Sequence, residues 1–332
     1  MPKGFFTQGF AILLSRQVTL NEVCECLKDY QIAKRIESSD DPNFGGTSAI
    51  IAYKPEVNGY VSVDLFPAPW PDHMGDPKED AMLFATWSMG HFGPHTYPGG
   101  LKRASQQAWR WPEAKDIVPQ HRAVIRLRMS YVFGAGGDAP VMPQDWDPRE
   151  ELDFLNKLVS SFSSLDAALC YFNPNGEVVV PFDQFADSLE HSAKHQLPPL
   201  DLWSNIRLFN VDDTWKLMDS VGNWQLEIRD HEVAFPLGLV DPQEVDHFIR
   251  NVTAYILTKG DVIKDGDTMD GPGKRRWQAK RLENGMSDPP REVLRWLPLK
   301  VRNIPAGLLT QAPDSEAEGE AKAKTKPFWK FW

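Results

Sequence analysis

The stretch HRAVIRLRMSYVF at residues 121–133, followed after a loop by DPREELDFLNKLVSSF at residues 147–162, determines the expected fold. The first part predicts a strand. In the second part Asp147 is a helix N-cap, Pro148 takes the first helical position and Glu150 completes a capping box. An apolar stripe at helical spacing follows, made of Leu152, Leu155, Val159 and Phe162. The two parts together predict a strand followed by an amphipathic helix.

The same order recurs at two other places. In residues 9–30 a strand precedes a helix whose capping box is formed by Thr19 and Glu22. In residues 223–257 a strand precedes a helix that starts with DPQE, much as the first example starts with DPRE. The apolar stripes are Leu20, Val23, Leu27 and Tyr30 in one helix, and Val245, Phe248, Ile249, Val252 and Ile256 in the other. Matching caps and stripes suggest duplicated building blocks, although convergent helix starts would produce the same likeness.

Hairpins are expected between these units. SAIIAYKPEVNGYVSVDLF at residues 48–66 predicts two strands joined by a type I′ turn at Asn58-Gly59. In its second strand Val61, Val63 and Leu65 should be buried, and Ser62 and Asp64 should face water. Further strands are expected within residues 167–182, 204–211 and 224–230. The sequence therefore predicts an α+β fold with mainly antiparallel sheets and packed helices, built from repeated strand–helix–hairpin units.

Composition divides the chain into three parts. Two prolines interrupt the pattern at HQLPPLDLW, residues 195–203, which predicts α+β domains at 1–198 and 199–310, either separate or packed as one unit. Residues 311–332 form a charged tail that is expected to be disordered, because its polar residues bury too little to offset their ordering entropy. The tail ends in four aromatic residues, Phe328, Trp329, Phe331 and Trp332. These are predicted either to bind a partner or to fold back on their own domain.

Charge and cysteine content exclude several classes of protein. The 332 residues carry a net charge of −10, which disfavours binding to nucleic acid through phosphate contacts. Such a charge suits solubility alone or a basic protein partner. Three cysteines are too few for a disulfide scaffold. Neither a signal peptide nor an apolar run of membrane-spanning length is evident, so we expect a cytoplasmic protein with reduced thiols.

Three glycine-rich motifs resemble known binding loops but lack essential residues. VFGAGGDA at residues 132–139 fits a dinucleotide fingerprint, yet prolines follow where a helix should begin. GPGKRRW at residues 271–277 lacks the first glycine and the hydroxyl of a phosphate-binding loop. KDGDTMDG at residues 264–271 has Met269 where a calcium loop needs an oxygen ligand. We therefore predict no cofactor.

Two histidine pairs are the candidates for a metal site. His91 and His95 lie in WSMGHFGPHTYPGG, residues 87–100, with His73 as a third ligand in the metal hypothesis. Because Gly93-Pro94 forbids a helix between the pair, a structured turn between two helices is the favoured interpretation.

His191 and His195 are better spaced, on a helix predicted at residues 181–195 with Asp187 one turn earlier. Phe185, Leu189 and Ala193 mark its buried side, so this pair should face solvent. Histidines in a last helical turn also complement the helix dipole without any metal. The sequence thus predicts no metal at either pair.

Several segments together resemble a known family. LWSNIRLFNV at 202–211, MDSVGNWQLEIRDHEVAF at 218–235, the helix beginning DPQEVDHFIR at 241 and GDVIKDGDTM at 260–269 are similar to the C-terminal signature of the bacterial family named domain of unknown function 4261. FGPHTYPGGLKRA at 92–104 and IRLRMSYVFG at 125–134 resemble upstream blocks of longer members. The resemblance implies strand edges and helix caps, but no activity and no functional residues.

We expect a non-catalytic module that binds another protein, with a basic partner best suited to its charge. One concrete form is an immunity or adaptor protein of a bacterial toxin or secretion system. The alternative is a hydrolase-like enzyme with a site around residues 87–100. A third hypothesis, nucleic-acid binding through KRRWQAKR at residues 274–281, has interleaved Arg and Trp in its favour and the overall charge against it.

Overall fold

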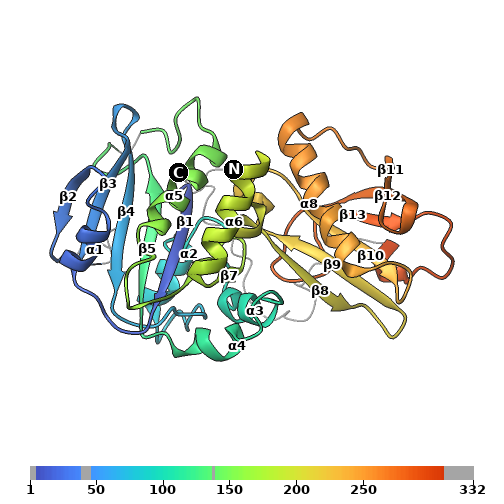
Figure 1. Ribbon diagram of the computed structural model, residues 1–332, viewed down its shortest axis with the longest axis horizontal. Helices are drawn as coiled ribbons and strands as arrows, with labels where there is room; N and C mark the ends of the chain where they lie inside the picture. The colour runs from blue at the N-terminus through green and yellow to red at the C-terminus, as the bar shows by residue number, and fades with distance from the viewer. Residues whose placement is uncertain (1–4, 39–45, 137–138, 310–332) are drawn as a thin grey trace.

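The computed structural model describes residues 5–38, 46–136 and 139–309. These residues form two lobes, each built on one β-sheet, which lie side by side along the long axis of the molecule (Figure 1). The first lobe is shown on the left and the second on the right. The last strand of the first sheet ends at Val180 and the first strand of the second begins at Asn205, so the predicted boundary at residues 195–203 falls between the sheets.

The first lobe contains a seven-stranded antiparallel sheet in the order β2-β3-β4-β5-β1-β6-β7. Its strands are β1 (Gln8–Leu14), β2 (Ile32–Ile36), β3 (Ser48–Lys54), β4 (Gly59–Phe66), β5 (Ala123–Ser130), β6 (Ala168–Asn173) and β7 (Val178–Val180). The short helix η1 (Pro55–Val57) joins β3 to β4. The interior strand β1 is buried along its whole length, because helices cover both faces of the sheet.

One face of this sheet packs on α1 (Leu20–Cys26), α5 (Pro148–Ser160) and α6 (Phe182–His195). The other face packs on α2 (Ala81–Ser88), α3 (Gly100–Gln106), α4 (Ala114–Ile117) and η2 (Val118–Gln120). Alternate residues of β1 enter the two cores: Phe10 and Ile12 lie in the first, and Ala11 and Leu13 in the second. This alternation follows from the period of two in a strand.

The second lobe contains a six-stranded sheet in the order β11-β12-β13-β10-β9-β8. Its strands are β8 (Asn205–Asn210), β9 (Trp215–Val221), β10 (Asp230–Pro236), β11 (Thr268–Gly271), β12 (Arg275–Leu282) and β13 (Val293–Pro298). The short helices η3 (Asn223–Leu226) and η4 (Pro272–Lys274) interrupt the connections. Within the described residues β10 and β13 are the one parallel pair.

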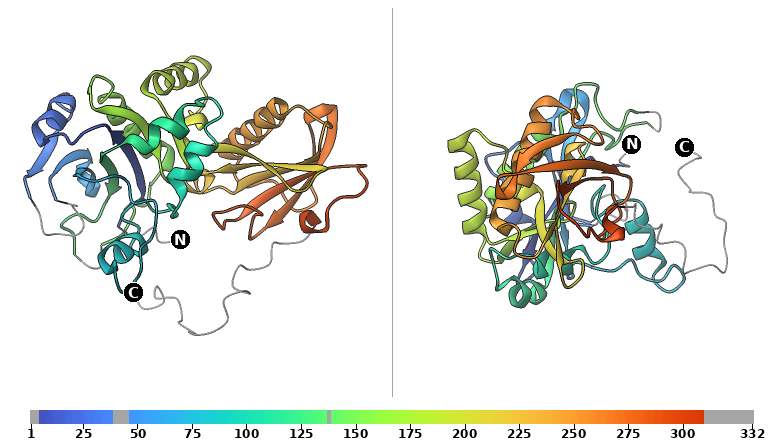
Figure 2. Two further views of the ribbon diagram at one scale, coloured as in Figure 1. Left: turned by 90° about the horizontal axis from the view of Figure 1, so that it is seen from below. Right: turned by 90° about the vertical axis from the view of Figure 1, so that its right-hand side faces the viewer.

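Two helices cover the second sheet from opposite sides (Figure 2). The long helix α8 (Pro242–Lys259) buries Val245, Phe248, Ile249, Val252 and Ile256, the stripe predicted from the sequence. On the other side α9 (Ala306–Leu309) buries Leu308 against Trp215 and Leu217. The short helix α7 (Leu200–Trp203) joins the lobes and packs in the core of the first. No helix in the described ranges is long and apolar enough to cross a membrane.

The prediction of an α+β fold with mainly antiparallel sheets and packed helices is confirmed. The three predicted strand-then-helix units are β1–α1, β5–α5 and β10–α8. That they are duplicated building blocks stays a prediction. The hairpin at residues 48–66 is also present as β3 and β4, but its turn differs from the prediction. Lys54 pairs with Gly59 across η1, and only Asn58 has a positive φ, so the two-residue type I′ turn was wrong.

The helix caps are confirmed, but two of the three capping boxes are not. Thr19 and Glu22 form the complete box. Asp147 and Asp241 each accept a hydrogen bond from the second amide of their helix. Glu150 instead pairs with Lys54 at 2.7 Å, and the Glu244 carboxylate accepts from the backbone N–H of Gly273 at 2.7 Å. Each of these glutamates thus bonds to a residue that is distant in the sequence, and a local sequence pattern cannot reveal such a partner.

Two other strand predictions were wrong in a way that bears on the site. The segment 224–230 is mostly η3 and its following turn, and β10 begins only at Asp230. Ser62 and Asp64, expected to face water, are fully buried. Asp64 is neutralised by Arg126 at 2.8 Å and by Arg128 at 2.9 Å. The face predicted to be wet is therefore a covered, ion-paired face of the first sheet.

Candidate binding site

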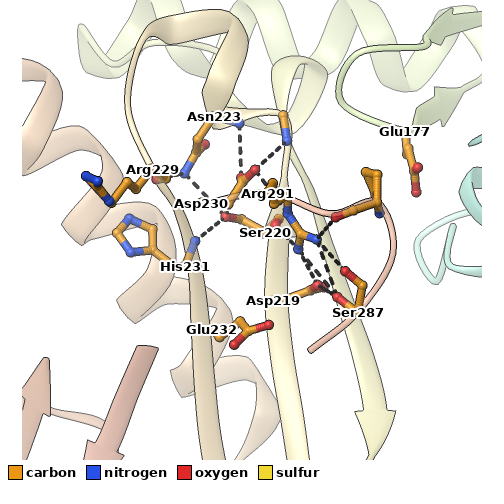
Figure 3. Close-up of polar contacts among 12 residues, drawn as sticks. Glu177, Asp219, Ser220, Asn223, Arg229, Asp230, His231, Glu232, Ser287 and Arg291 are labelled. Carbon is orange, nitrogen blue, oxygen red and sulfur yellow. Dashed lines mark hydrogen bonds and ion pairs between the residues drawn. The ribbon is translucent and has the colours of Figure 1, made fainter. Parts of the chain in front are cut away.

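A buried network of charged side chains occupies the second lobe (Figure 3). Its centre is Asp219 on β9, whose Oδ2 accepts hydrogen bonds from Arg207 Nη2 at 2.6 Å and from Arg291 Nη2 at 2.5 Å. All three side chains are at most 2% exposed. Burial alone would raise the pKa of Asp219, but the two guanidinium groups outweigh that effect and hold the pKa below its usual value. The centre of the network is therefore a carboxylate between two cations.

Asp230, at the start of β10, ties the β9–β10 connection to this centre. Its Oδ1 accepts hydrogen bonds from Ser220 Oγ at 2.8 Å and from the backbone N–H of Asn223 at 3.1 Å. Arg291 Nε lies 3.2 Å from Asp230 Oδ2, so Arg291 bridges the two aspartates. Burial raises the pKa of Asp230 even though Arg291 opposes the shift. These contacts fix the backbone that carries η3.

Glu177 extends the network into the first lobe. It is the last residue of the β6–β7 turn and has a φ of 49°. Glu177 accepts hydrogen bonds from Arg103 Nε at 2.9 Å and from Arg207 Nη1 at 3.0 Å. Burial raises the pKa of Glu177, while both arginines act against that shift. The buried Arg207–Glu177 ion pair thus joins the two lobes. Such a pair offsets the desolvation cost of its charges only when the hydrogen-bond geometry is good.

His231 lies one residue beyond Asp230 and is completely buried. Burial lowers the pKa of its imidazole to about 3, so the ring is neutral in the folded protein. Trp296 Nε1 donates to His231 Nδ1 at 3.5 Å, which is a long contact. His231 is therefore a core histidine, and the structure gives it no role as a proton donor.

The buried imidazole predicts a pH dependence of stability. The unfolded-state pKa of the imidazole is about 6.5, so below that pH the unfolded chain binds a proton on His231 and the folded chain does not. The contribution of the neutral ring to the free energy of unfolding is therefore fully present above that pH and is lost as pH falls toward 3. We expect wild type to lose about 1.4 kcal/mol per pH unit more than His231→Gln, which cannot titrate. Urea unfolding of both proteins at pH 7, 6 and 5 measures the difference. A gap between them that does not change with pH would contradict the prediction.

A cavity of about 310 Å³ opens beside the network, between the loop after α2 and the second lobe. His95 is its residue from the first lobe, and the other lining residues are Trp224, Glu227, Ile228, Arg229, Asp261, Glu283, Asn284, Pro290, Arg291 and Glu292. The His95 and Trp224 rings meet edge to face, with centroids 5.9 Å apart. Arg291 belongs to both the cavity wall and the buried network. We call this cavity the acidic pocket.

The acidic pocket has an excess of negative charge. Four carboxylates, those of Glu227, Asp261, Glu283 and Glu292, face two guanidinium groups in its lining. Arg229 pairs with Glu292 at 2.5 Å and lies 3.7 Å from Asp261, which also forms an ion pair with Arg281. The charge of Arg291 is taken up by Asp219 and Asp230. The exposed Glu283 carboxylate shares this lining with the Trp224 indole, and a carboxylate beside an aromatic ring is the environment that a cationic side chain prefers.

The candidate histidines of the 87–100 loop contact different neighbours. The buried His91 ring packs edge-on against Phe5 and Phe6, with centroids 6.4 and 5.6 Å away. The His95 ring lies against Trp224, and its backbone N–H donates to Asn175 Oδ1 at 3.1 Å. His73 is exposed. The loop does connect α2 to α3, as predicted, and it packs on the face of the first sheet.

His191 and His195 lie on α6, as predicted, and both are exposed. Their ring centroids are 4.2 Å apart, and His195 Nδ1 is 2.8 Å from the carbonyl oxygen of His191. Asp187 is exposed on the same helix. Across the described ranges, no group of three or more His, Cys, Asp or Glu side chains is placed to hold a metal ion.

Two candidate segments remain, the basic stretch at residues 274–281 and the four aromatic residues of the tail. The segment KRRWQAKR consists of Lys274 and the first seven residues of β12, and its Trp277 is completely buried against Phe248. A nucleic-acid base cannot stack on this buried indole, so the hypothesis of a stacking groove at residues 274–281 was wrong. Phe328, Trp329, Phe331 and Trp332 lie outside the described residues.

Comparison with known proteins identifies part of the second lobe. Residues 219–297 match the model of a family described as Domain of unknown function (DUF4261), which confirms the resemblance over this segment. The match begins at Asp219 and includes Asp230, Arg291 and nearly all residues of the acidic pocket. No curated protein matches the chain, and no solved structure matches it.

Proposed function

We propose that this chain, whose residues 219–297 belong to a domain family of unknown function, binds a basic protein partner and has no chemistry of its own. The acidic pocket is the observation that carries the proposal. All of its lining residues except His95 lie within the family segment, its indole ring is partly accessible, and its backbone is fixed by the buried network. A rigid concave site of this kind suits one inserted Lys or Arg side chain of a partner.

The overall charge supports the same partner. A net charge of −10 attracts a basic surface over a distance and raises the rate of encounter, while the pocket provides the specific contact. The buried residues of the network are enclosed and paired, so they do not provide an accessible nucleophile or base. A protein that masks a basic toxin, or an adaptor in a secretion assembly, is the concrete form we propose.

The hydrolase-like alternative would need the histidines of the 87–100 loop to converge. His91 packs against Phe6 and His95 against Trp224, so these contacts give the alternative no support. His95 instead contributes to the wall of the acidic pocket. The loop therefore enters the proposal as a rigid part of the binding surface.

The proposal is tested by affinity capture from cells of the source organism with the full chain as bait. We expect a basic protein to be recovered, with an affinity that falls as salt rises. Trp224→Ala and Glu283→Lys should each weaken its binding at least tenfold, because one removes the aromatic wall and the other reverses an exposed charge in the pocket.

Glu190→Lys is the matched control, since Glu190 is exposed on α6 and does not line the pocket. It makes the same change in net charge as Glu283→Lys. General electrostatic attraction therefore predicts that both variants lose the same affinity for the partner, whereas a specific site predicts a larger loss of affinity for Glu283→Lys. Deletion of residues 311–332 tests the tail as a second contact. Recovery of no basic protein, or equal binding by all variants, would contradict the proposal.

A further inference from the structure

A second cavity, of about 260 Å³, lies between the two lobes and away from the acidic pocket. Its walls come from Ala104 of α3 and the segment after it (residues 107–111), from β7 and α6, and from residues 201, 204, 205 and 250. We call it the junction groove. Strands β7 and β8 are the terminal strands of their sheets, and both contribute to it. The outer edge of β8 is already covered, because Trp109 Nε1 donates to Ile206 O and Leu208 N–H donates to Gln107 Oε1.

One buried polar group in the junction groove is unsatisfied. Ser204 lines the groove and is 3% exposed, and its Oγ has no hydrogen-bond partner among the described residues. A buried hydroxyl without a partner costs about 1–3 kcal/mol, so such groups usually mark a place where something else supplies the bond. Two amide side chains also line the groove: Gln107 Oε1 accepts from the Leu208 N–H at 3.3 Å, and Gln184 Nε2 donates to the Arg110 carbonyl at 3.3 Å.

Apart from Asp187, which is exposed on α6 at the side of the groove, the charged side chains here pair with one another. Asp201 accepts from Arg110 at 2.6 Å and lies 2.8 Å from Arg250, and Arg250 Nε donates to Asp246 at 3.1 Å. Two arginines and two aspartates thus form a closed alternating set. An ionic ligand would have to disrupt these pairs, whereas a neutral one would not.

The remaining surface is apolar and aromatic. Ala104, Ala108, Val178 and Val179 line the groove, and the half-exposed Trp109 stands at its side with the Arg110 guanidinium 5.4 Å from the ring centroid. An apolar floor beside alternating amide and hydroxyl groups matches an extended peptide, whose main chain offers N–H and C=O groups in turn.

We propose that the junction groove binds a neutral extended peptide segment, which places one apolar side chain on the valine and alanine floor and hydrogen-bonds to the Ser204 hydroxyl. The proposal extends the proposed function by giving the partner a second contact that recognises backbone and shape instead of charge. The acidic pocket would then provide attraction, and the junction groove would select an uncharged segment of the same partner.

The test uses the capped peptide acetyl-Gly-Leu-Gly-amide and the full chain labelled with ¹⁵N at its tryptophans. The Trp109 indole signal, assigned with a Trp109→Phe variant, is followed as peptide is added. We expect this signal to shift and saturate, and Ser204→Ala to weaken binding about tenfold through loss of one hydrogen bond. Ser204→Ala should fold normally, since the hydroxyl has no hydrogen-bond partner among the described residues.

Ser105→Ala is the matched control, because Ser105 Oγ on α3 bonds to Lys102 O and Ser105 does not line the groove. It should bind like wild type. Peptides with Asp or Lys in place of Leu should leave the Trp109 signal unmoved. The inference is overturned if the neutral peptide does not shift Trp109, if the charged peptides shift it equally, or if Ser204→Ala binds as well as wild type. The Trp224 indole reports on the acidic pocket separately, so failure to find a basic partner would be distinguishable from failure here.

Discussion

Gly176→Ala is expected to lower the free energy of unfolding by about 3 kcal/mol. Gly176 lies in the β6–β7 turn, at the contact between the lobes. A Cβ at this position would overlap the carbonyl oxygen of Trp203 and come within 3.0 Å of its carbonyl carbon. Both atoms are backbone, so neither can rotate away. Gly222 on the facing turn is equally close, since a Cβ there would lie 2.6 Å from Gly176 Cα.

The contact is rigid because side-chain amides fix it on both sides. Asn173 Nδ2 donates to Gln225 Oε1 at 3.1 Å, and Gln225 Nε2 donates to the Gly222 carbonyl at 2.8 Å. The Asn205 backbone N–H donates to the Gly176 carbonyl at 3.2 Å. An added methyl group would therefore separate the lobes and break buried hydrogen bonds, instead of displacing a flexible side chain.

Urea unfolding measures the effect, and Gly307→Ala is the control. A Cβ at Gly307 would meet only Met286 Cε, at 3.9 Å, so alanine should be tolerated in α9. Equal stability of the two variants would show that the turns can move apart, and would contradict the close packing described here.

The order of strands and helices could be predicted because it depends on local patterns. The DPRE and DPQE helix starts, and the stripes that follow them, need no knowledge of distant residues. Glu150 and Glu244 had the right spacing for capping boxes but bond to Lys54 and Gly273 instead. Long-range partners of this kind are invisible to a local pattern.

The burial of charge could not be predicted for the same reason. Alternation in β4 correctly separates two faces, but it cannot tell that Asp64 meets Arg126 and Arg128 under a covering loop. A pattern of apolar and charged residues in a strand is typical of a sheet with one wet face. Here the charged face is buried as well, because Asp64 on β4 pairs with two arginines of the neighbouring strand β5.

The candidate site was missed because its residues are dispersed. Glu177, Arg207, Asp219 and Arg291 come from four segments with no shared spacing. The signal that was available is the family resemblance, whose matched segment, residues 219–297, includes Asp219, Arg291 and the lining of the acidic pocket other than His95. The histidine pairs attracted notice because H-x-x-x-H is a local pattern. In the structure only His95 contributes to the pocket, as an aromatic ring beside Trp224.

Asp219→Asn is expected to cost about 3–5 kcal/mol of stability at neutral pH, because it leaves the charges of Arg207 and Arg291 buried without their shared carboxylate. Asparagine keeps the size of the side chain, so the loss reports on charge and not on a cavity. The dependence on pH has a definite sign. The folded pKa of Asp219 lies below 3.8, so its contribution is fully present above that pH and is lost as pH falls through the folded pKa.

Asp270→Asn is the matched control, since Asp270 pairs with Arg276 at 3.3 Å on the exposed surface of the same sheet. An exposed pair of this kind contributes at most about 1 kcal/mol. Unfolding of both variants between pH 7 and pH 3 should show a large gap at neutral pH that narrows in acid. If Asp219→Asn is no less stable than Asp270→Asn, the arginines have other means of neutralisation, and the network does not hold the acidic pocket in place. If it is less stable but the partner still binds to the folded fraction, the network acts on the pocket only by keeping its backbone folded.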